Sequence, residues 1–273
     1  MRCLLLVALA ALGCKNQQPS PPPQALLLGT VPSQSERLRV EAIRPLAAYL
    51  QAQVGLPVNA EIAADYKGVL AALAARRYDV AITGPMIALR AQDGYRVVAK
   101  PVRRGAPTYR AQILVRADGP VRALGDLRGK VLALVDQYSE SGYLVPRRMV
   151  RGAGLDPDRD LKKALVGTHD NAVLGVLYGL YDAGACFEGA EAQVLRDQPA
   201  QKERLRVLAR SEPIPNDPVL VRRDLDAGTA AAIVRALLAL DGRPEARAVL
   251  APFGAESFVA ASDGEYAALG KAE

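Results

Sequence analysis

Two serines and a glycine that follow a predicted strand are the residues of this chain best suited to bind an anion. Ser139, Ser141 and Gly142 come directly after the apolar run 131–135 and open a predicted helix. The first turn of a helix carries backbone N–H groups without intrahelical partners and the positive end of the helix dipole, and serine hydroxyls add donors. The pattern therefore predicts an oxyanion site that needs no lysine.

A histidine and two tyrosines could complete such a site. His169, the only histidine among 273 residues, lies between the predicted strand 164–168 and the helix that follows Asp170, which we expect to be a helix cap. Tyr66 and Tyr109 fall where loops meet regular elements, and a phenol can donate a hydrogen bond while its ring lines a pocket. A purely structural role remains the alternative for all three side chains.

Catalytic and metal chemistry fit the sequence less well. A serine hydrolase elbow needs a glycine two residues before the nucleophile, and the residue two before Ser139 is Gln137. One histidine and a distant cysteine offer no metal-ligand spacing, and no Walker loop is present. We therefore expect a binding protein with no cofactor and no metal, not an enzyme.

The N-terminus predicts export and lipid anchoring. Residues 1–14 combine one basic residue, a short apolar run and small residues before Cys14, as in a bacterial signal peptide. Residues 11–14 resemble a lipoprotein box in which Cys14 receives the lipid, and the proline-rich residues 15–24 suit an extended tether. The predicted location is the periplasm or cell surface, attached to a bacterial membrane through the N-terminal lipid.

Cysteine content and charge narrow the function further. Cys3 would leave with the signal peptide and Cys14 would be acylated, so Cys186 alone remains in the mature body and no intramolecular disulfide is expected. The net charge of +6 favours anionic partners weakly, because lysines and arginines are scattered without interleaved aromatic residues. We do not expect nucleic-acid binding.

Alternating strand and helix patterns predict an α/β fold with largely parallel sheets. Two crossings, near residues 116–120 and 210–215, would divide the chain into lobe 1 (25–116 and 215–273) and lobe 2 (117–214). We also expect Pro45 to begin a separate helix. Ligands of open α/β sheets bind outside the carboxyl ends of the strands, which places the site in a central cleft between the lobes.

Several segments together resemble one family. They are ADYKGVLAALAARRYDVAITGP (64–85), TYRAQILVR (108–116), DLRGKVLALVDQYSESGYLVP (126–146), GTHDNAVLGVLYGLYDAGA (167–185) and SEPIPNDPVLVR (211–222). In this order they resemble the phosphate/phosphite/phosphonate-binding proteins of ABC transporters, the PhnD-like periplasmic solute-binding lipoproteins. The resemblance implies a type II periplasmic-binding-protein fold, with two hinged α/β lobes around a central ligand cleft, and an ABC transporter permease as partner.

The same resemblance implies the ligand contacts. Two tyrosines, a Ser-Thr-Ser helix start and a histidine hold the phosphorus oxygens in the family, and the matching residues are Tyr66, Tyr109, Ser139, Ser141 and His169. Asp217 and Glu188 match carboxylates that face the ammonium group of aminoalkylphosphonates.

Glu140 departs from the family pattern, because it occupies the place of the threonine. A carboxylate ~4 Å from a full ligand charge costs about 4 kcal/mol at an effective dielectric of ~20, which would weaken binding of a bare dianion roughly a thousandfold. Glu140 could turn outward, accept the proton of a protonated oxyanion, or indicate a ligand that is not a phosphorus oxyanion.

The function expected from these observations is capture of a small phosphorus oxyanion, a phosphonate, phosphite or phosphate, for an ABC importer. The alternative is a periplasmic sensor subunit for another small oxyanion or a neutral oxyacid such as arsenite, with a membrane histidine kinase as partner. Cys186, near the predicted cleft, could serve such a sensor, although a small buried structural thiol fits it equally.

Overall fold

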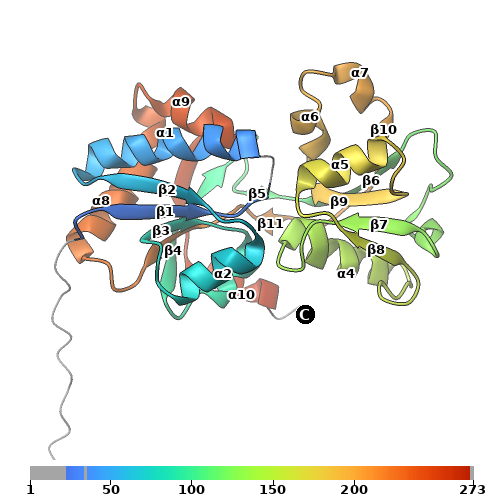
Figure 1. Ribbon diagram of the computed structural model, residues 1–273, viewed down its shortest axis with the longest axis horizontal. Coiled ribbons are helices and arrows are strands. Elements are labelled where there is room, and N and C mark those ends of the chain that lie inside the picture. Colours follow the sequence, from blue (N-terminus) through green and yellow to red (C-terminus); the bar gives the residue numbers. More distant parts are fainter. Residues whose placement is uncertain (1–22, 34–35, 271–273) are drawn as a thin grey trace, which may run out of the picture.

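The chain forms two α/β lobes that lie side by side and meet at a two-stranded ribbon (Figure 1). The computed structural model describes residues 23–33 and 36–270. The signal peptide, and the tether as far as residue 22, were predicted for a segment outside these described residues. Within them, every helix is too short or too polar to cross a membrane.

Lobe 1 contains a six-stranded sheet with the order β13-β4-β12-β3-β1-β2. The strands are β1 (Leu26–Thr30), β2 (Val58–Ile62), β3 (Val80–Ile82), β4 (Tyr95–Val102), β12 (Val219–Arg222) and β13 (Ser257–Ala260). β1 is parallel to β2 and β3, but β12 is antiparallel to β3 and β4, and β13 is antiparallel to β4.

Helices cover both faces of this sheet. They are α1 (Glu36–Val54), α2 (Tyr66–Ala74), α3 (Pro85–Arg90), α8 (Ala227–Leu238), α9 (Ala246–Leu250) and α10 (Asp263–Gly270), with 3-10 turns η3 (Leu240–Gly242) and η4 (Ala251–Phe253). Val80 and Ile82 pack in the core beneath α1 and α8, whereas Ala81 belongs to the core beneath α2 and α3. The alternation reflects the two-residue side-chain period of a strand buried on both faces.

α1 continues through Pro45, so the prediction of a separate helix beginning there is wrong. A proline inside a helix removes a backbone hydrogen bond and costs about 3 kcal/mol. Leu46 and Leu50, which follow it, are buried in the core against β1 and α8. Helix stability in proteins comes mainly from such packing, which here outweighs the local preference.

Lobe 2 contains a five-stranded sheet with the order β10-β6-β9-β7-β8. Its strands are β6 (Ala111–Arg116), β7 (Val131–Leu134), β8 (Lys162–Leu165), β9 (Ala183–Phe187) and β10 (Leu205–Arg210). Its helical segments are η1 (Leu124–Leu127), the π-helical turn η2 (Glu140–Leu144), α4 (Val145–Gly152), α5 (His169–Leu177), α6 (Ala190–Val194) and α7 (Pro199–Lys202). β7 is parallel to β8 and β9, but β6 runs antiparallel to β9 and β10.

Both sheets are therefore mixed, and the prediction of largely parallel sheets is wrong for β4, β6, β10, β12 and β13. The chain crosses into lobe 2 just before β6 and returns to lobe 1 just before β12. The strand that follows each crossing, β6 or β12, enters its sheet from the lobe junction. It therefore runs antiparallel to a neighbouring strand that belongs to a βαβ unit.

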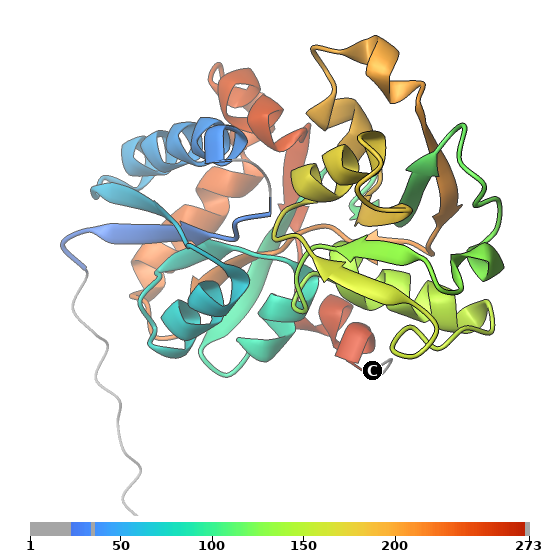
Figure 2. The ribbon, with the colours of Figure 1, turned by 45° about the vertical axis from the view of Figure 1, so that its right-hand side comes forward.

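The lobes are joined by a short antiparallel ribbon of β5 (Thr108–Tyr109) and β11 (Ile214–Pro215). The first crossing thus precedes β6, which is part of the second sheet, and the predicted boundary after residue 116 is placed too late. β11 lies between β10 and β12 at the second crossing. In both views α10 lies beside this junction (Figures 1 and 2), and the Tyr266 hydroxyl donates to the carbonyl of Asn216 over 2.7 Å.

Candidate functional site

A cleft of about 700 Å³ lies between the lobes and is lined by residues of both. It brings together every ligand-contact residue proposed from the sequence, namely Tyr66, Tyr109, Ser139, Glu140, Ser141, His169, Glu188 and Asp217. The hinge ribbon contributes Tyr109 on β5 and Asp217 just after β11, and the others follow strands of the two sheets.

Helix starts line the inner surface of the cleft. α2 begins at Tyr66 behind Asp65, whose side chain accepts from the Gly68 N–H over 2.6 Å. α5 begins at His169 behind Thr168, whose hydroxyl accepts from the Asn171 N–H over 3.1 Å. Each of these helices has nine residues, and each presents the positive end of its dipole to the cleft.

The third helix start is the serine motif. Ser139 caps the π-helical turn η2 by accepting from the Gly142 N–H over 3.1 Å, and η2 runs directly into α4. A Cβ on Gly142 would lie 2.5 Å from the Val135 side chain. Glycine is therefore needed for this turn to pack against the residue that follows β7, and that packing places Ser139 and Ser141 at the cleft.

Tyr109 is a neutral hydrogen-bonding group beside the serines. Burial raises its pKa well above the ordinary value of 10, and the nearby carboxylates of Asp217 and Glu140 act in the same direction. Its hydroxyl shares a hydrogen bond with the Ser141 side chain. Ser141 is buried as well, so the pair offers hydroxyl groups, and not charges, to a ligand in the cleft.

His169 is also neutral. Burial lowers its pKa to about 3, because the imidazolium ion is poorly solvated in this position. The ring stands edge-on to Phe187 with centroids 4.9 Å apart, and its Nδ1 is buried without a hydrogen-bond partner in the described structure. The His169 backbone N–H donates to the Ser33 carbonyl over 3.0 Å, a contact between the lobes. The imidazole is thus available to a ligand, whereas this N–H is not.

Glu140 does not turn out to solvent. Its side chain is 0% exposed, and its Oε1 accepts from Arg148 Nη2 over 2.8 Å. Arg148 therefore offsets the carboxylate charge, and the penalty estimated for an uncompensated charge is reduced. A regular helix would rotate residues eight positions apart by about 80° from one another, and the π-helical turn between them alters that register. The pair could not be recognised from helical spacing.

The other two carboxylates of the cleft are also paired with arginines. Asp217 accepts from Arg103 Nη1 over 3.2 Å. Glu188 lies 3.0 Å from Arg210 Nε. Neither carboxylate is a bare negative charge that awaits a cation.

Sequence reasoning missed the arginines of the cleft wall, which are Arg103, Arg104, Arg110 and Arg196. The first three fall within eight residues that include Tyr109, and this local density was the available signal. Over the whole chain this local density is masked, because lysines and arginines are scattered throughout the sequence.

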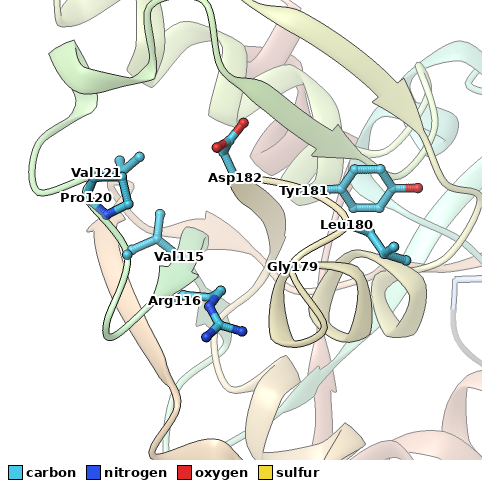
Figure 3. A pocket seen from close by; sticks show the side chains of 9 residues that line it. Val115, Arg116, Pro120, Val121, Gly179, Leu180, Tyr181 and Asp182 are labelled. Atoms are coloured by element: carbon cyan, nitrogen blue, oxygen red, sulfur yellow. The ribbon is translucent and has the colours of Figure 1, made fainter.

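A smaller depression of about 150 Å³ lies at the other end of β6 and β9, around Val115, Pro120 and Tyr181 (Figure 3). Its charged groups are already engaged: Arg116 pairs with Asp118, and Asp182 accepts from the Val131 N–H over 2.8 Å. Figure 3 shows the Arg116 and Asp182 side chains pointing away from each other. The depression lacks convergent free donors, so the cleft between the lobes is the candidate site.

Cys186 belongs to the lobe 2 core and is not among the cleft-lining residues. Burial raises the pKa of its thiol to about 12, so the thiolate does not form at neutral pH. The Cys186 thiol is therefore not placed to contact a ligand in the cleft, as a thiol-dependent sensor would require. Among residues 23–33 and 36–270, no group of histidine, cysteine and carboxylate side chains is arranged to hold a metal.

Comparison with known proteins is consistent with this geometry. Residues 28–266 match the family described as "ABC transporter, phosphonate, periplasmic substrate-binding protein". The chain belongs to this family. It is 28% identical over 247 residues to the phosphonates-binding periplasmic protein of Escherichia coli, covering 88% of this chain and 73% of that protein.

Solved structures of this family have the same fold. A binding-protein component of an ABC phosphonate transporter from Pseudomonas aeruginosa superposes with a TM-score of 0.84 at 24% identity, over 90% of this chain and 84% of that one. PhnD1 from Prochlorococcus marinus, in complex with methylphosphonate, gives 0.83 at 18% identity, over 91% and 96%.

Family membership confirms the resemblance seen in the sequence and the type II binding-protein fold. It makes the chain a periplasmic solute-binding protein and not an enzyme, with a small ligand and an ABC transporter permease as partner.

We predict that His169 makes the stability of this family member depend on pH. Its folded pKa of about 3 lies below the ordinary value of 6.5, so between these values the unfolded state binds more protons and stability falls as pH falls. Between pH 7 and pH 5 this costs about 2 kcal/mol. Denaturant unfolding at both pH values should show a drop smaller by about that amount for His169→Gln than for the unchanged protein. Equal drops would contradict the assignment.

We further predict that Arg148→Gln destabilises the protein by about 3 kcal/mol, because it leaves the buried Glu140 carboxylate uncompensated. Thermal or denaturant unfolding measures the loss. The double variant Glu140→Gln/Arg148→Gln should recover most of it, since both charges are then removed. A double variant no more stable than Arg148→Gln would show that the two residues are not energetically coupled.

Proposed function

We propose that this protein captures a small phosphorus oxyanion, a phosphonate, phosphite or phosphate, and delivers it to its ABC transporter permease. The observation that carries the proposal is the convergence of helix starts and neutral donors in one cleft. Phosphorus oxygens are strong acceptors, and helix N-termini bind them through backbone N–H groups and the dipole.

Each proposed contact has a physical role. Ser139 Oγ accepts from Gly142, which leaves its hydroxyl hydrogen free to donate to the ligand. Ser141 and Tyr109 share one hydrogen bond and present their remaining capacity to the cleft. Neutral His169 donates from one ring nitrogen. Tyr66, at the start of α2, lines the cleft from the opposite lobe, lobe 1.

Charge compensation supports an anionic ligand. Each carboxylate of the cleft, Glu140, Glu188 and Asp217, has an arginine partner. The repulsion that Glu140 would exert on a dianion is reduced accordingly. An oxyanion that is either protonated or fully ionised can then use the same donors.

The N-terminal segment supports a second part of the proposal, in which Cys14 carries a lipid and residues 15–24 tether the two-lobed body to the membrane. Such an anchor would confine the protein near the permease without burying any part of the ligand-binding body.

Isothermal calorimetry with phosphate, phosphite, methylphosphonate and aminoethylphosphonate tests the ligand class. We expect heat with at least one of them, and Ser141→Ala should weaken it tenfold or more, because a hydrogen bond to a charged group contributes about 1.5–3 kcal/mol. Ser262→Ala, at an exposed serine of lobe 1, is the matched control and should bind as the unchanged protein does. Absence of heat and of competition with all four would reject the ligand class.

Fatty-acid labelling in a bacterial host tests the anchor. The full chain should incorporate labelled palmitate and sediment with membranes, and Cys14→Ser should do neither. Cys186→Ser is the control, since its buried thiol lies in the lobe 2 core, and it should label normally. An unlabelled, freely soluble parent protein would refute the lipid anchor.

A further inference from the structure

The cleft is larger than a small oxyanion requires. The volume of the cleft is about 700 Å³. A small oxyanion, which is about the size of three or four water molecules, occupies only roughly 100 Å³. Pockets of this volume hold ligands of drug-like size in other proteins. Part of the cleft wall is therefore free to contact whatever the oxyanion is attached to.

Two arginines on that wall have no carboxylate partner in the described part of the chain. Arg110 donates from Nη1 to the Ser211 carbonyl over 2.5 Å, which leaves most of its guanidinium donors unused. Arg104 is exposed and makes no hydrogen bond or ion pair with any described residue. Since each carboxylate of the cleft already has its own arginine, these two guanidinium groups give the wall an excess of positive charge.

The backbone holds Arg104 in place. It lies in a turn closed by hydrogen bonds in both directions between Arg103 and Ala106, and the neighbouring Gly105 N–H donates to the Glu256 carboxylate. Arg104 has φ 53°, in the left-handed region that arginine seldom adopts. Backbone strain of this kind persists where surrounding structure imposes it and is concentrated at functional sites.

Both arginines meet the same segment of lobe 2. The Glu188 N–H donates to the Arg110 carbonyl over 2.9 Å. A Cβ built on Gly189 would lie 1.9 Å from Arg104 Nη2, so the guanidinium of this lobe 1 residue rests against the Gly189 backbone across the cleft. Residues 188 and 189 thus adjoin the Arg110 backbone and the Arg104 guanidinium, and both arginines line the same cleft.

We propose that Arg104 and Arg110 bind a second anionic group of the ligand, so that the preferred substrates are organophosphonates whose substituent carries a carboxylate or a second phosphoryl group. The inference rests on the proposed function, because the first oxyanion must occupy the helix starts. Asp217 and Glu188, which would receive an ammonium group, are engaged by Arg103 and Arg210. An aminoalkyl substituent would therefore gain less from this cleft than an anionic one.

Calorimetry with methylphosphonate, aminoethylphosphonate, phosphonoacetate and methylenediphosphonate tests the inference. We expect phosphonoacetate or methylenediphosphonate to bind at least tenfold more tightly than methylphosphonate, and the comparison between these two identifies the second group. Arg104→Gln should remove that advantage while changing methylphosphonate affinity less than threefold. Arg159→Gln, which deletes an exposed charge outside the cleft, should keep it.

The outcomes separate the two proposals. The second-anion subsite would be overturned if methylphosphonate bound as tightly as the ligands with two anionic groups. It would also be overturned if the tighter binding of those ligands survived in Arg104→Gln. Either result would leave the proposed function standing. Tighter binding of aminoethylphosphonate than of both phosphonoacetate and methylenediphosphonate would overturn the subsite as well. Failure of all four ligands to bind would overturn the second-anion subsite, and binding of phosphate or phosphite in the same assay would still leave the proposed function standing.

Discussion

Polar groups buried between the two lobes need hydrogen-bond partners, and this requirement governs the site. Ser139, Ser141 and His169 are all buried at helix starts, where backbone N–H groups also lack intrahelical partners. Burying such groups without partners costs free energy, and water or a ligand must offset that cost. A ligand rich in acceptor oxygens satisfies several of them at once. The proposed anion would thus be attracted by helix dipoles and neutral donors rather than by full positive charges.

Full charges have a different role, because they set the electrostatic balance around the neutral donors. The Glu140–Arg148 and Glu188–Arg210 pairs lie within lobe 2, and Asp217–Arg103 lies within lobe 1. None of these three pairs joins one lobe to the other, so a hinge movement would break none of them. Opening and closing of the cleft would then depend on interlobe contacts such as the bond from the His169 N–H to Ser33.

The hinge ribbon places a proposed ligand contact at the junction between the lobes. Tyr109 lies on β5, opposite Ile214 of β11, and its hydroxyl reaches Ser141 in lobe 2. Ala111, Val145 and Ile214 form a small apolar cluster beside it. Tyr109 packs in the hinge and also lines the cleft. A ligand in the cleft would therefore lie against the segment that connects the two lobes.

The sequence by itself determined the two-lobed α/β fold, the helix starts and the residues around them, because these depend on local signals. An apolar strand followed by Ser139 and Gly142, or Thr168 before His169, specifies a strand, a cap and a helix within a few residues. The family's motifs retain these local patterns, so eight residues that line the cleft could be proposed as ligand contacts without coordinates. The mixed sheets could not be predicted equally well, since strand direction depends on the route by which the chain crosses between lobes.

Only the tertiary structure decided how the charges pair. Arg148 neutralises Glu140 across a π-helical turn, Arg103 meets Asp217 114 positions away, and Arg104 reaches Gly189 of the other lobe. Pro45 likewise remains inside a helix because distant core residues pack around its neighbours. Such outcomes depend on which segments are neighbours in space, and local propensity carries no information about that. The positions of the helix starts could therefore be predicted from the sequence. The pairing of charges around the cleft could not, because it depends on which distant segments the fold brings together.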